Sequence, residues 1–133
     1  MRISGSSILL TGASGGLGQA MGRTFAANGA RLVATARNVQ QLEALAADTG
    51  AEIVVADLCD RTDVEALIER CADIDILVAN AGTGADVAVL DESPDHIDQV
   101  VDVNLRAPIQ LATAFAQAKL EQGTPAHIVM VGS

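Results

Sequence analysis

The residues best suited to chemistry form a glycine-rich turn near the start of the chain. Residues 11–18 read TGASGGLG and join the apolar run 7–10 to a stretch with helical periodicity. Glycines let a backbone approach a ligand closely, and the free amides at a helix start attract an anion. The spacing is neither the GxGxxG of the common dinucleotide motif nor a Walker A loop, which needs Lys followed by Ser or Thr. We expect the turn to bind nucleotide phosphates, the alternative being a purely structural turn, through Gly12, Ser14, Gly15, Gly16, Leu17 and Gly18.

The end of the next apolar run should determine which nucleotide the turn accepts. Residues 35–38 read TARN, without a carboxylate, and Arg37 follows Gly18 by 19 residues. An acidic residue at this place binds a ribose 2′-hydroxyl, whereas an arginine accommodates a 2′-phosphate with paired hydrogen bonds. We therefore predict NADP(H) as the cofactor and disfavour NAD(H). The alternative is that Arg37 is a solvated residue at the start of a helix.

Alternating strands and helices have to position these residues. Short apolar runs at 7–10, 32–34, 53–55, 74–79 and 128–131 alternate with longer helical stretches. Parallel strands require crossover connections, and apolar runs without polar alternation indicate that helices cover both sheet faces. The pattern predicts an α/β fold, a doubly wound parallel sheet of the Rossmann type, as one domain over residues 1–133. Its ligand should lie beyond the carboxyl ends of the strands, where the glycine turn and Arg37 both fall.

Local patterns also predict several helix ends. The chain should leave its first helix at Asn28-Gly29 and its second at Gly50, because both sequences are typical of helix C-caps. Residues 62–65 read TDVE, the pattern of a capping box. Ser93-Pro94 should open a long helix as its cap and first residue.

Asn104 lies within that long helix at an unusual place. It falls on an apolar stripe that includes Val100, Val101 and Leu105, so we expect a buried amide that serves a polar network. Pro108 has no amide hydrogen, which removes the helical partner of the Asn104 carbonyl and should kink the helix. The alternative is a satisfied core asparagine at a kink.

Five motifs in this order resemble those of the short-chain dehydrogenase/reductase family, over the whole chain. Residues 11–18 match its TGxxxGxG, and Asp57-Leu58 resembles the pair that flanks adenine. Residues 79–82 resemble its Asn-Asn-Ala-Gly, with Ala79 in place of the first Asn. Residues 103–105 and 128–133 resemble the motifs that carry its catalytic Asn and Ser.

The resemblance implies a role for each matching residue. Asn104 would hold a water of the proton relay through its carbonyl, and Ser133 would polarise the substrate carbonyl as the second catalytic residue. Asn80 would tie the central strands together, while Asp57 has the alternative of capping a turn or a helix. The cofactor-binding set implied by these motifs comprises Asp57, Leu58, Asn80, Ala81 and Gly82.

The family's catalytic Tyr and Lys lie downstream of its Ser, in a YxxxK motif. This sequence contains no Tyr, its single lysine is Lys119, and it ends at Ser133. We expect an NADP(H)-dependent oxidoreductase that transfers a hydride between the nicotinamide and a carbonyl or alcohol. The residues given would be its N-terminal portion, with the C-terminal part of the fold absent, and would be inactive alone. The alternative is a non-catalytic module of Rossmann fold that binds a nucleotide or another protein.

The charge and cysteine content of the chain argue against several classes of partner. Lys plus Arg number 8 and Asp plus Glu number 17, so the net charge is −9. Such a field repels nucleic acid and anionic membranes, and we expect neither as a partner. Cys59 and Cys71 fit no metal or redox spacing, so we expect free thiols, no metal site and a cytoplasmic location. The family resemblance implies a homodimer or homotetramer.

Overall fold

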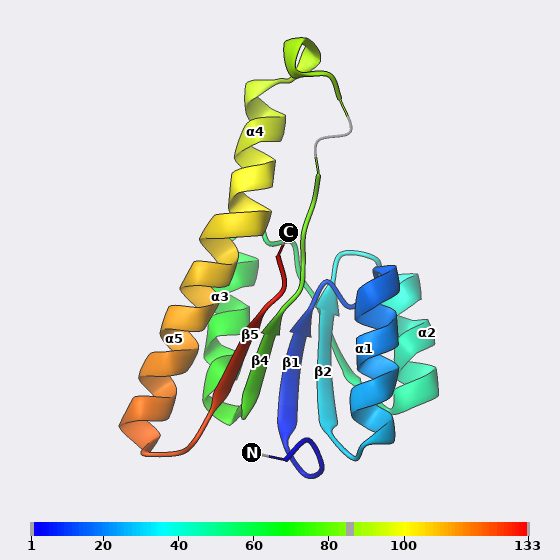
Figure 1. Ribbon diagram of the computed structural model, residues 1–133, viewed down its shortest axis with the longest axis vertical. Helices are drawn as coiled ribbons and strands as arrows, with labels where there is room; N and C mark the ends of the chain where they lie inside the picture. Colours follow the sequence, from blue (N-terminus) through cyan, green and yellow to red (C-terminus); the bar gives the residue numbers. More distant parts are fainter. Residues whose placement is uncertain (1, 85–86, 133) are drawn as a thin grey trace.

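The computed structural model describes residues 2–84 and 87–132. Its strands form one parallel sheet in the order β3-β2-β1-β4-β5, which confirms the predicted doubly wound α/β fold (Figure 1). The chain runs outward through β2 and β3 and then returns to the other side of β1. The strands are β1 (Ser7–Thr11), β2 (Arg31–Ala36), β3 (Glu52–Val55), β4 (Ile76–Ala79) and β5 (His127–Met130).

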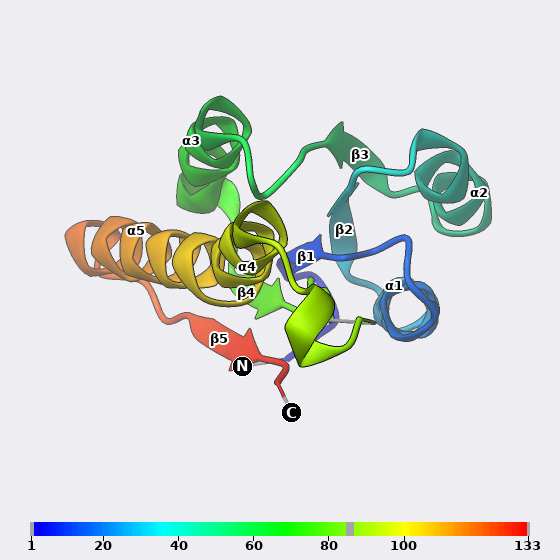
Figure 2. The ribbon, with the colours of Figure 1, turned by 90° about the horizontal axis from the view of Figure 1, so that it is seen from above.

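Helices cover both faces of this sheet (Figure 2). The helices α1 (Gly16–Ala27) and α2 (Val39–Thr49) lie on one face, and α3 (Arg61–Arg70) and α5 (Ala107–Gln122) lie on the other. Short 3₁₀ turns η1 (Cys71–Asp73) and η2 (Val89–Asp91) precede β4 and α4 (Pro94–Val101). Among the described residues, no helix combines the length and apolar composition needed to span a bilayer.

The central strand β1 explains why the apolar runs lack polar alternation. Successive side chains of a strand point to opposite faces. Leu9 therefore packs in the core beneath α3 and α5, while Ile8 and Leu10 pack in the core beneath α1 and α2. All three are fully buried. A strand with a core on each side has no solvent-facing position for a polar residue.

Most predicted helix ends are observed, and one is wrong. Asn28 is the C-cap of α1, Gly50 ends α2 with φ of 69°, and the Ser93 side chain accepts a hydrogen bond from His96 N at the start of α4. The capping box predicted at residues 62–65 is not the start of α3. Asp60 is the N-cap instead, and its carboxylate accepts hydrogen bonds from two amides of the first turn. A carboxylate two residues earlier occupies the place that Thr62 would have taken.

The long helix after Ser93 is interrupted rather than simply kinked. A π-helical segment, η3 (Asp102–Arg106), separates α4 from α5, and the Ala107 amide bonds to the Asp102 carbonyl five residues back. Pro108 follows directly, so the missing amide that we predicted from sequence coincides with a wider helical turn. Asn104 lies in the middle of this segment.

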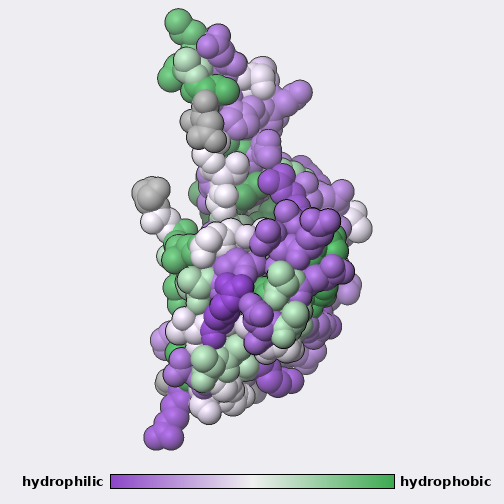
Figure 3. All heavy atoms as spheres, turned by 90° about the vertical axis from the view of Figure 1, so that its right-hand side faces the viewer, coloured by the Kyte–Doolittle hydropathy of each residue, from purple (hydrophilic) through white to green (hydrophobic). Residues whose placement is uncertain are grey.

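The fold places one end of the molecule apart from the rest. The segment containing η2 and α4 extends beyond the carboxyl ends of the strands (Figure 1). Hydrophilic side chains cover most of the α1–α2 side, whereas apolar side chains gather at the top, where η2 lies (Figure 3). Val89 and Leu90 are 90% and 98% exposed there.

Candidate functional site

A cleft of about 1080 Å³ lies at the carboxyl ends of the strands, beside the point where the strand order reverses. Ligands bind at this place in doubly wound sheets. Every predicted site residue within the described part of the chain lines it, while Ser133 lies outside the described residues. Those lining residues are Gly12, Ser14, Gly15, Gly16, Leu17, Gly18, Arg37, Asp57, Leu58, Asn80, Ala81, Gly82 and Asn104.

Two glycines of the turn are required by packing. Gly12 has φ of +65°, and a Cβ there would lie 2.7 Å from the Ala81 Cα. A Cβ on Gly18 would lie only 2.1 Å from the Gly12 carbonyl oxygen. Both contacts are with backbone, which cannot move aside cheaply. These glycines therefore allow the turn, the start of α1 and the end of β4 to come together.

The other two glycines face open space. A Cβ on Gly16 would meet nothing within 4 Å, and one on Gly15 would meet only the Gly12 carbonyl oxygen at 3.6 Å. Protein packing therefore does not explain why these positions lack side chains. Both line the cleft, so the absent side chains leave room for a ligand to approach the backbone.

The start of α1 also lacks the side-chain cap that α2, α3 and α4 have. Side chains of Asn38, Asp60 and Ser93 accept hydrogen bonds at the starts of α2, α3 and α4, but α1 has no side-chain cap bond. Its first helical amide bond runs from Gln19 N to Gly15 O, at 2.8 Å. The amides of residues 16–18 precede that bond, and no acidic residue occupies the first turn. Such an end attracts an anion.

Hydrogen bonds between Thr11 and Asn80 hold the cleft's floor together. The Thr11 Oγ1 accepts bonds from Asn80 N and Ala81 N, both at 3.0 Å, and Asn80 Nδ2 donates to Thr11 O at 3.1 Å. These bonds join the ends of β1 and β4, which is the tie expected of Asn80. The sequence motifs alone do not predict this role of Thr11. Its position at a strand end, opposite a second polar strand end, was the available signal.

Asp57 makes the turn contact that was the alternative to adenine binding. Its Oδ1 accepts a hydrogen bond from Cys59 N at 3.0 Å, and its own amide donates to the Asp63 carboxylate at 2.8 Å. Burial raises the pKa of the Cys59 thiol, the Asp57 carboxylate raises it further, and Arg37 lowers it. Arg37, Asp57 and Leu58 line the same cleft.

Arg37 itself is exposed and follows directly on β2. Among the described residues its side chain makes no hydrogen bond and no ion pair. Arg23 pairs with Asp48, Arg70 with Glu52 and Arg106 with Asp102, whereas Arg2, Arg31 and Arg61 are, like Arg37, without such a contact in the described part of the chain. Of these four, only Arg37 lines the cleft. A guanidinium without a partner at the rim of a cleft is suited to binding an anion.

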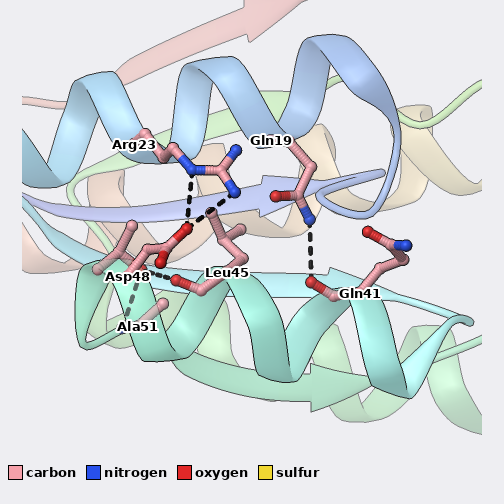
Figure 4. Close-up of polar contacts among 7 residues, drawn as sticks. Gln19, Arg23, Gln41, Leu45, Asp48 and Ala51 are labelled. Atoms are coloured by element: carbon pink, nitrogen blue, oxygen red, sulfur yellow. Dashed lines mark hydrogen bonds and ion pairs between the residues drawn. The ribbon is translucent and has the colours of Figure 1, made fainter.

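Polar contacts between α1 and α2 link the two anion-attracting positions (Figure 4). Gln19 Nε2 donates to the Gln41 carbonyl at 2.9 Å, and the Arg23 guanidinium bonds Asp48 Oδ2 at 2.9 and 3.0 Å. The helix α1 begins at the glycine turn, and α2 begins just after Arg37. The contacts therefore help to set the separation between the turn and Arg37.

The predicted burial of Asn104 is wrong. The residue is exposed, as are Ile97, Val101 and Leu105 of the same stripe, because α4 and η3 extend beyond the sheet. Its amide is nevertheless paired: Oδ1 accepts from Thr83 N at 2.8 Å, and Nδ2 donates to Thr83 O at 2.7 Å. The side chain thus fixes the loop that follows Gly82.

Within the part of the chain that the structure describes, the single lysine and the two cysteines make no contact that suggests a catalytic role. Lys119 is buried away from the cleft, where its Nζ donates to Ala72 O and Gln122 Oε1, both at 2.9 Å. Cys59 and Cys71 are free thiols, and burial raises the pKa of Cys71 to about 11. The described residues contain no cluster of His, Cys, Asp and Glu suited to a metal ion.

Comparisons with known proteins agree with this geometry. The family model for short chain dehydrogenase matches residues 6–133. L-xylulose reductase of Bos taurus is 34% identical over 100% of this chain and 55% of its own length. The cyclic-di-GMP-binding biofilm dispersal mediator protein of Escherichia coli K12 is 34% identical over 97% of this chain and 54% of its own.

A solved structure shares both fold and sequence. A short-chain dehydrogenase from Sphingobium yanoikuyae in complex with NADPH superposes with a TM-score of 0.89 and 35% identity, over 96% of this chain and 54% of that one. The chain thus spans about half the length of the relatives that it matches. Sequence, strand order and cleft agree: the chain belongs to the short-chain dehydrogenase family.

Proposed function

We propose that the protein is an NADP(H)-dependent oxidoreductase that transfers a hydride between the nicotinamide and a carbonyl or alcohol substrate. The observation that carries this proposal is the uncapped start of α1, whose open Gly15 and Gly16 line the same cleft as the unpaired Arg37. The NADPH complex of the Sphingobium relative supports a nicotinamide cofactor. The cofactor would supply the hydride, and the protein would bind, orient and protonate.

The lining residues fit the parts of that cofactor. The amides of residues 16–18 and the Ser14 region would bind the pyrophosphate, and Arg37 would bind the 2′-phosphate. Asp57 and Leu58 would contact the adenine. Ala81 and Gly82, which carry little or no side chain, would leave room for a ribose.

Two residues would act on protons and on the substrate. The Asn104 carbonyl has no amide donor at Pro108, so it would hold a water of the proton relay. Ser133 would polarise the substrate carbonyl, because it follows Val131 and Gly132, which line the cleft. The tyrosine expected from the family is not among these 133 residues. We therefore propose nucleotide binding for these residues, and catalysis for a protein that also contains that tyrosine.

The test is the variant Arg37→Ala in the full-length protein, titrated with NADPH and with NADH. Loss of a paired guanidinium–phosphate contact should reduce the preference for NADPH by about 10- to 100-fold and leave NADH affinity nearly unchanged. The variant Arg61→Ala removes the same charge at α3, outside the lining of the cleft, and serves as the control. An unchanged NADPH preference in Arg37→Ala would contradict the assignment.

A non-catalytic nucleotide-binding protein is the second candidate. The name of the Escherichia coli relative describes a cyclic dinucleotide ligand and no reaction, which favours this alternative. The discriminating measurement is NADPH oxidation by the full-length protein with a panel of ketones and aldehydes. Nucleotide binding without any oxidation would favour the second candidate.

We also propose that the protein assembles as a homodimer or homotetramer through its long helix. Support comes from an unpartnered apolar ridge with a spacing of four residues. It consists of Ile97, Val101, Leu105 and Ile109, which are 50%, 39%, 56% and 52% exposed. Apolar ridges of this kind mark interaction surfaces.

A further inference from the structure

Two threonines at neighbouring strand ends have the same shape and burial but different bonding. Thr11 and Thr35 are register partners in β1 and β2, and they are 2% and 1% exposed. The Thr11 hydroxyl accepts bonds from two amides. The Thr35 Oγ1 is closed to solvent and has no hydrogen-bond partner among the described residues.

An unpaired buried hydroxyl is unfavourable for folding. The group loses its bonds to water and gains none in the protein. Valine has nearly the same shape, is at least as favourable in a strand, and carries no polar atom. Folding of the ligand-free chain therefore does not explain a threonine at position 35.

The surroundings of Thr35 indicate which ligand group its hydroxyl would meet. Thr35 lines the cleft, two residues before Arg37, and its carbonyl accepts a hydrogen bond from Ala13 N in the glycine turn at 3.1 Å. The same part of the lining contains residues 56–58. The opposite end of the lining, at residues 82–84 and 131–132, follows the ends of β4 and β5.

We propose that Thr35 Oγ1 is a positioning group for the adenosine half of the dinucleotide and forms its hydrogen bond only when that half is bound. This inference rests on the proposed function. The hydroxyl is closed to solvent in the free protein, so the bond would form on a change of χ1 between staggered rotamers together with displacement of the atoms that cover Thr35. The protein thus accepts an unsatisfied hydroxyl in the free state and recovers the bond in the complex.

The experiment compares Thr35→Val, Thr35→Ser and Thr11→Val in the full-length protein. Without ligand, Thr35→Val should melt at the same temperature as wild type or up to about 4 °C higher, because it removes an unpaired polar atom. Thr11→Val should melt lower, because the amides of Asn80 and Ala81 lose their acceptor. Melting of Thr35→Val below wild type, or failure to fold, would show that the hydroxyl is already paired and would overturn the inference.

The second measurement is titration with 2′,5′-ADP, which carries the adenosine half of NADP, and with nicotinamide mononucleotide. Thr35→Val should bind 2′,5′-ADP about two- to tenfold more weakly, while Thr35→Ser stays within about twofold of wild type. Affinity for nicotinamide mononucleotide should not change. Equal 2′,5′-ADP affinity of wild type and Thr35→Val overturns this inference alone. Absence of 2′,5′-ADP binding by the wild type overturns the proposed function and this inference together.

Discussion

Gly16 and Gly18 belong to one turn, yet the surrounding atoms constrain them differently. A Cβ on Gly18 would overlap the Gly12 carbonyl, whereas one on Gly16 would enter open space at the cleft. Packing within the fold therefore explains why residue 18 has no side chain. The absence of a side chain at residue 16 is explained only by a ligand in the cleft.

Alanine substitutions should separate these two reasons. Gly18→Ala should lower the free energy of unfolding by about 1–3 kcal/mol, because the new methyl group overpacks a backbone contact. Gly16→Ala should change that free energy by less than about 0.5 kcal/mol and weaken NADPH binding roughly tenfold or more. Chemical denaturation and NADPH titration of both variants provide the measurements. Normal NADPH affinity in a folded Gly16→Ala protein would show that the phosphates bind elsewhere.

Asp75 links the amino ends of the two central strands β1 and β4, at the side of the sheet opposite the cleft. Its Oδ2 accepts hydrogen bonds from Ser7 N at 2.8 Å and from Ser7 Oγ at 2.9 Å. The bond from the Ser7 amide lowers the pKa of the Asp75 carboxyl, although partial burial opposes the shift. A carboxyl whose pKa is lower in the folded state stabilises the fold above its unfolded pKa.

The stability from Asp75 should therefore disappear in acid. The wild-type free energy of unfolding should decrease as the pH falls from about 4 through the lowered pKa of the folded state. Asp75→Asn should show a shallower decrease over that interval, measured by urea unfolding at a series of pH values. Asp73→Asn is the control, because the Asp73 carboxylate makes no hydrogen bond among the described residues. Parallel pH profiles for wild type and Asp75→Asn would refute this explanation.

The start of α3 shows how an element boundary depends on a few atoms. Asp60 Oδ1 accepts hydrogen bonds from Thr62 N at 2.8 Å and Asp63 N at 3.2 Å. Capping boxes and single carboxylate caps satisfy the same free amides, so sequence patterns two residues apart compete for one helix start. The Asp63 carboxylate also accepts a hydrogen bond from Asp57 N. This bond holds the residues that precede α3 against its first turn, where Asp60 caps it.

Alanine substitution distinguishes the two caps. Asp60→Ala should lower the free energy of unfolding by about 0.5–2 kcal/mol, because two amides of the first turn lose their acceptor. Thr62→Ala should change it by less than about 0.5 kcal/mol, since the Thr62 side chain is exposed. Denaturant melts monitored by circular dichroism measure both. A larger loss of unfolding free energy in Thr62→Ala than in Asp60→Ala would show that Thr62 caps the helix, as the capping-box pattern predicted.

At the scale of the whole molecule, the long helix leaves an apolar ridge that the rest of the fold does not cover. Ile109 lies on that ridge, is 52% exposed and belongs to α5. In the full-length protein, Ile109→Glu should convert the assembly to a smaller species, because a charge cannot be buried there without a partner. Light scattering after size-exclusion chromatography gives the mass. The control is Val39→Glu, on the opposite face of the sheet, at a side chain that is 43% exposed. An unchanged mass for Ile109→Glu would place the subunit contact elsewhere.

Short-range patterns were sufficient to predict the parallel sheet, the glycine turn and the cap at Ser93. Burial of both sheet faces leaves its mark on every residue of the central strand β1, whereas the apolar residues of the edge strand β5 are exposed. Turns and caps depend on neighbours within about four positions. These features could therefore be predicted from consecutive residues. The missing amide of Pro108 predicted a disturbance of the helix, but as a kink and not as the π-helical segment Asp102–Arg106 that precedes it.

Contacts between distant segments required the folded chain. Asn104 pairs with Thr83 across 21 positions, and Asn80 pairs with Thr11 across 69. A helical stripe has the same spacing whether a sheet or solvent faces it, so the exposure of Asn104 followed only from α4 and η3 extending beyond the strands. Likewise, nothing near Thr35 in the chain distinguishes its unpaired hydroxyl from the bonded hydroxyl of Thr11. Which donors reach a buried oxygen is decided by the segments that the fold brings beside it.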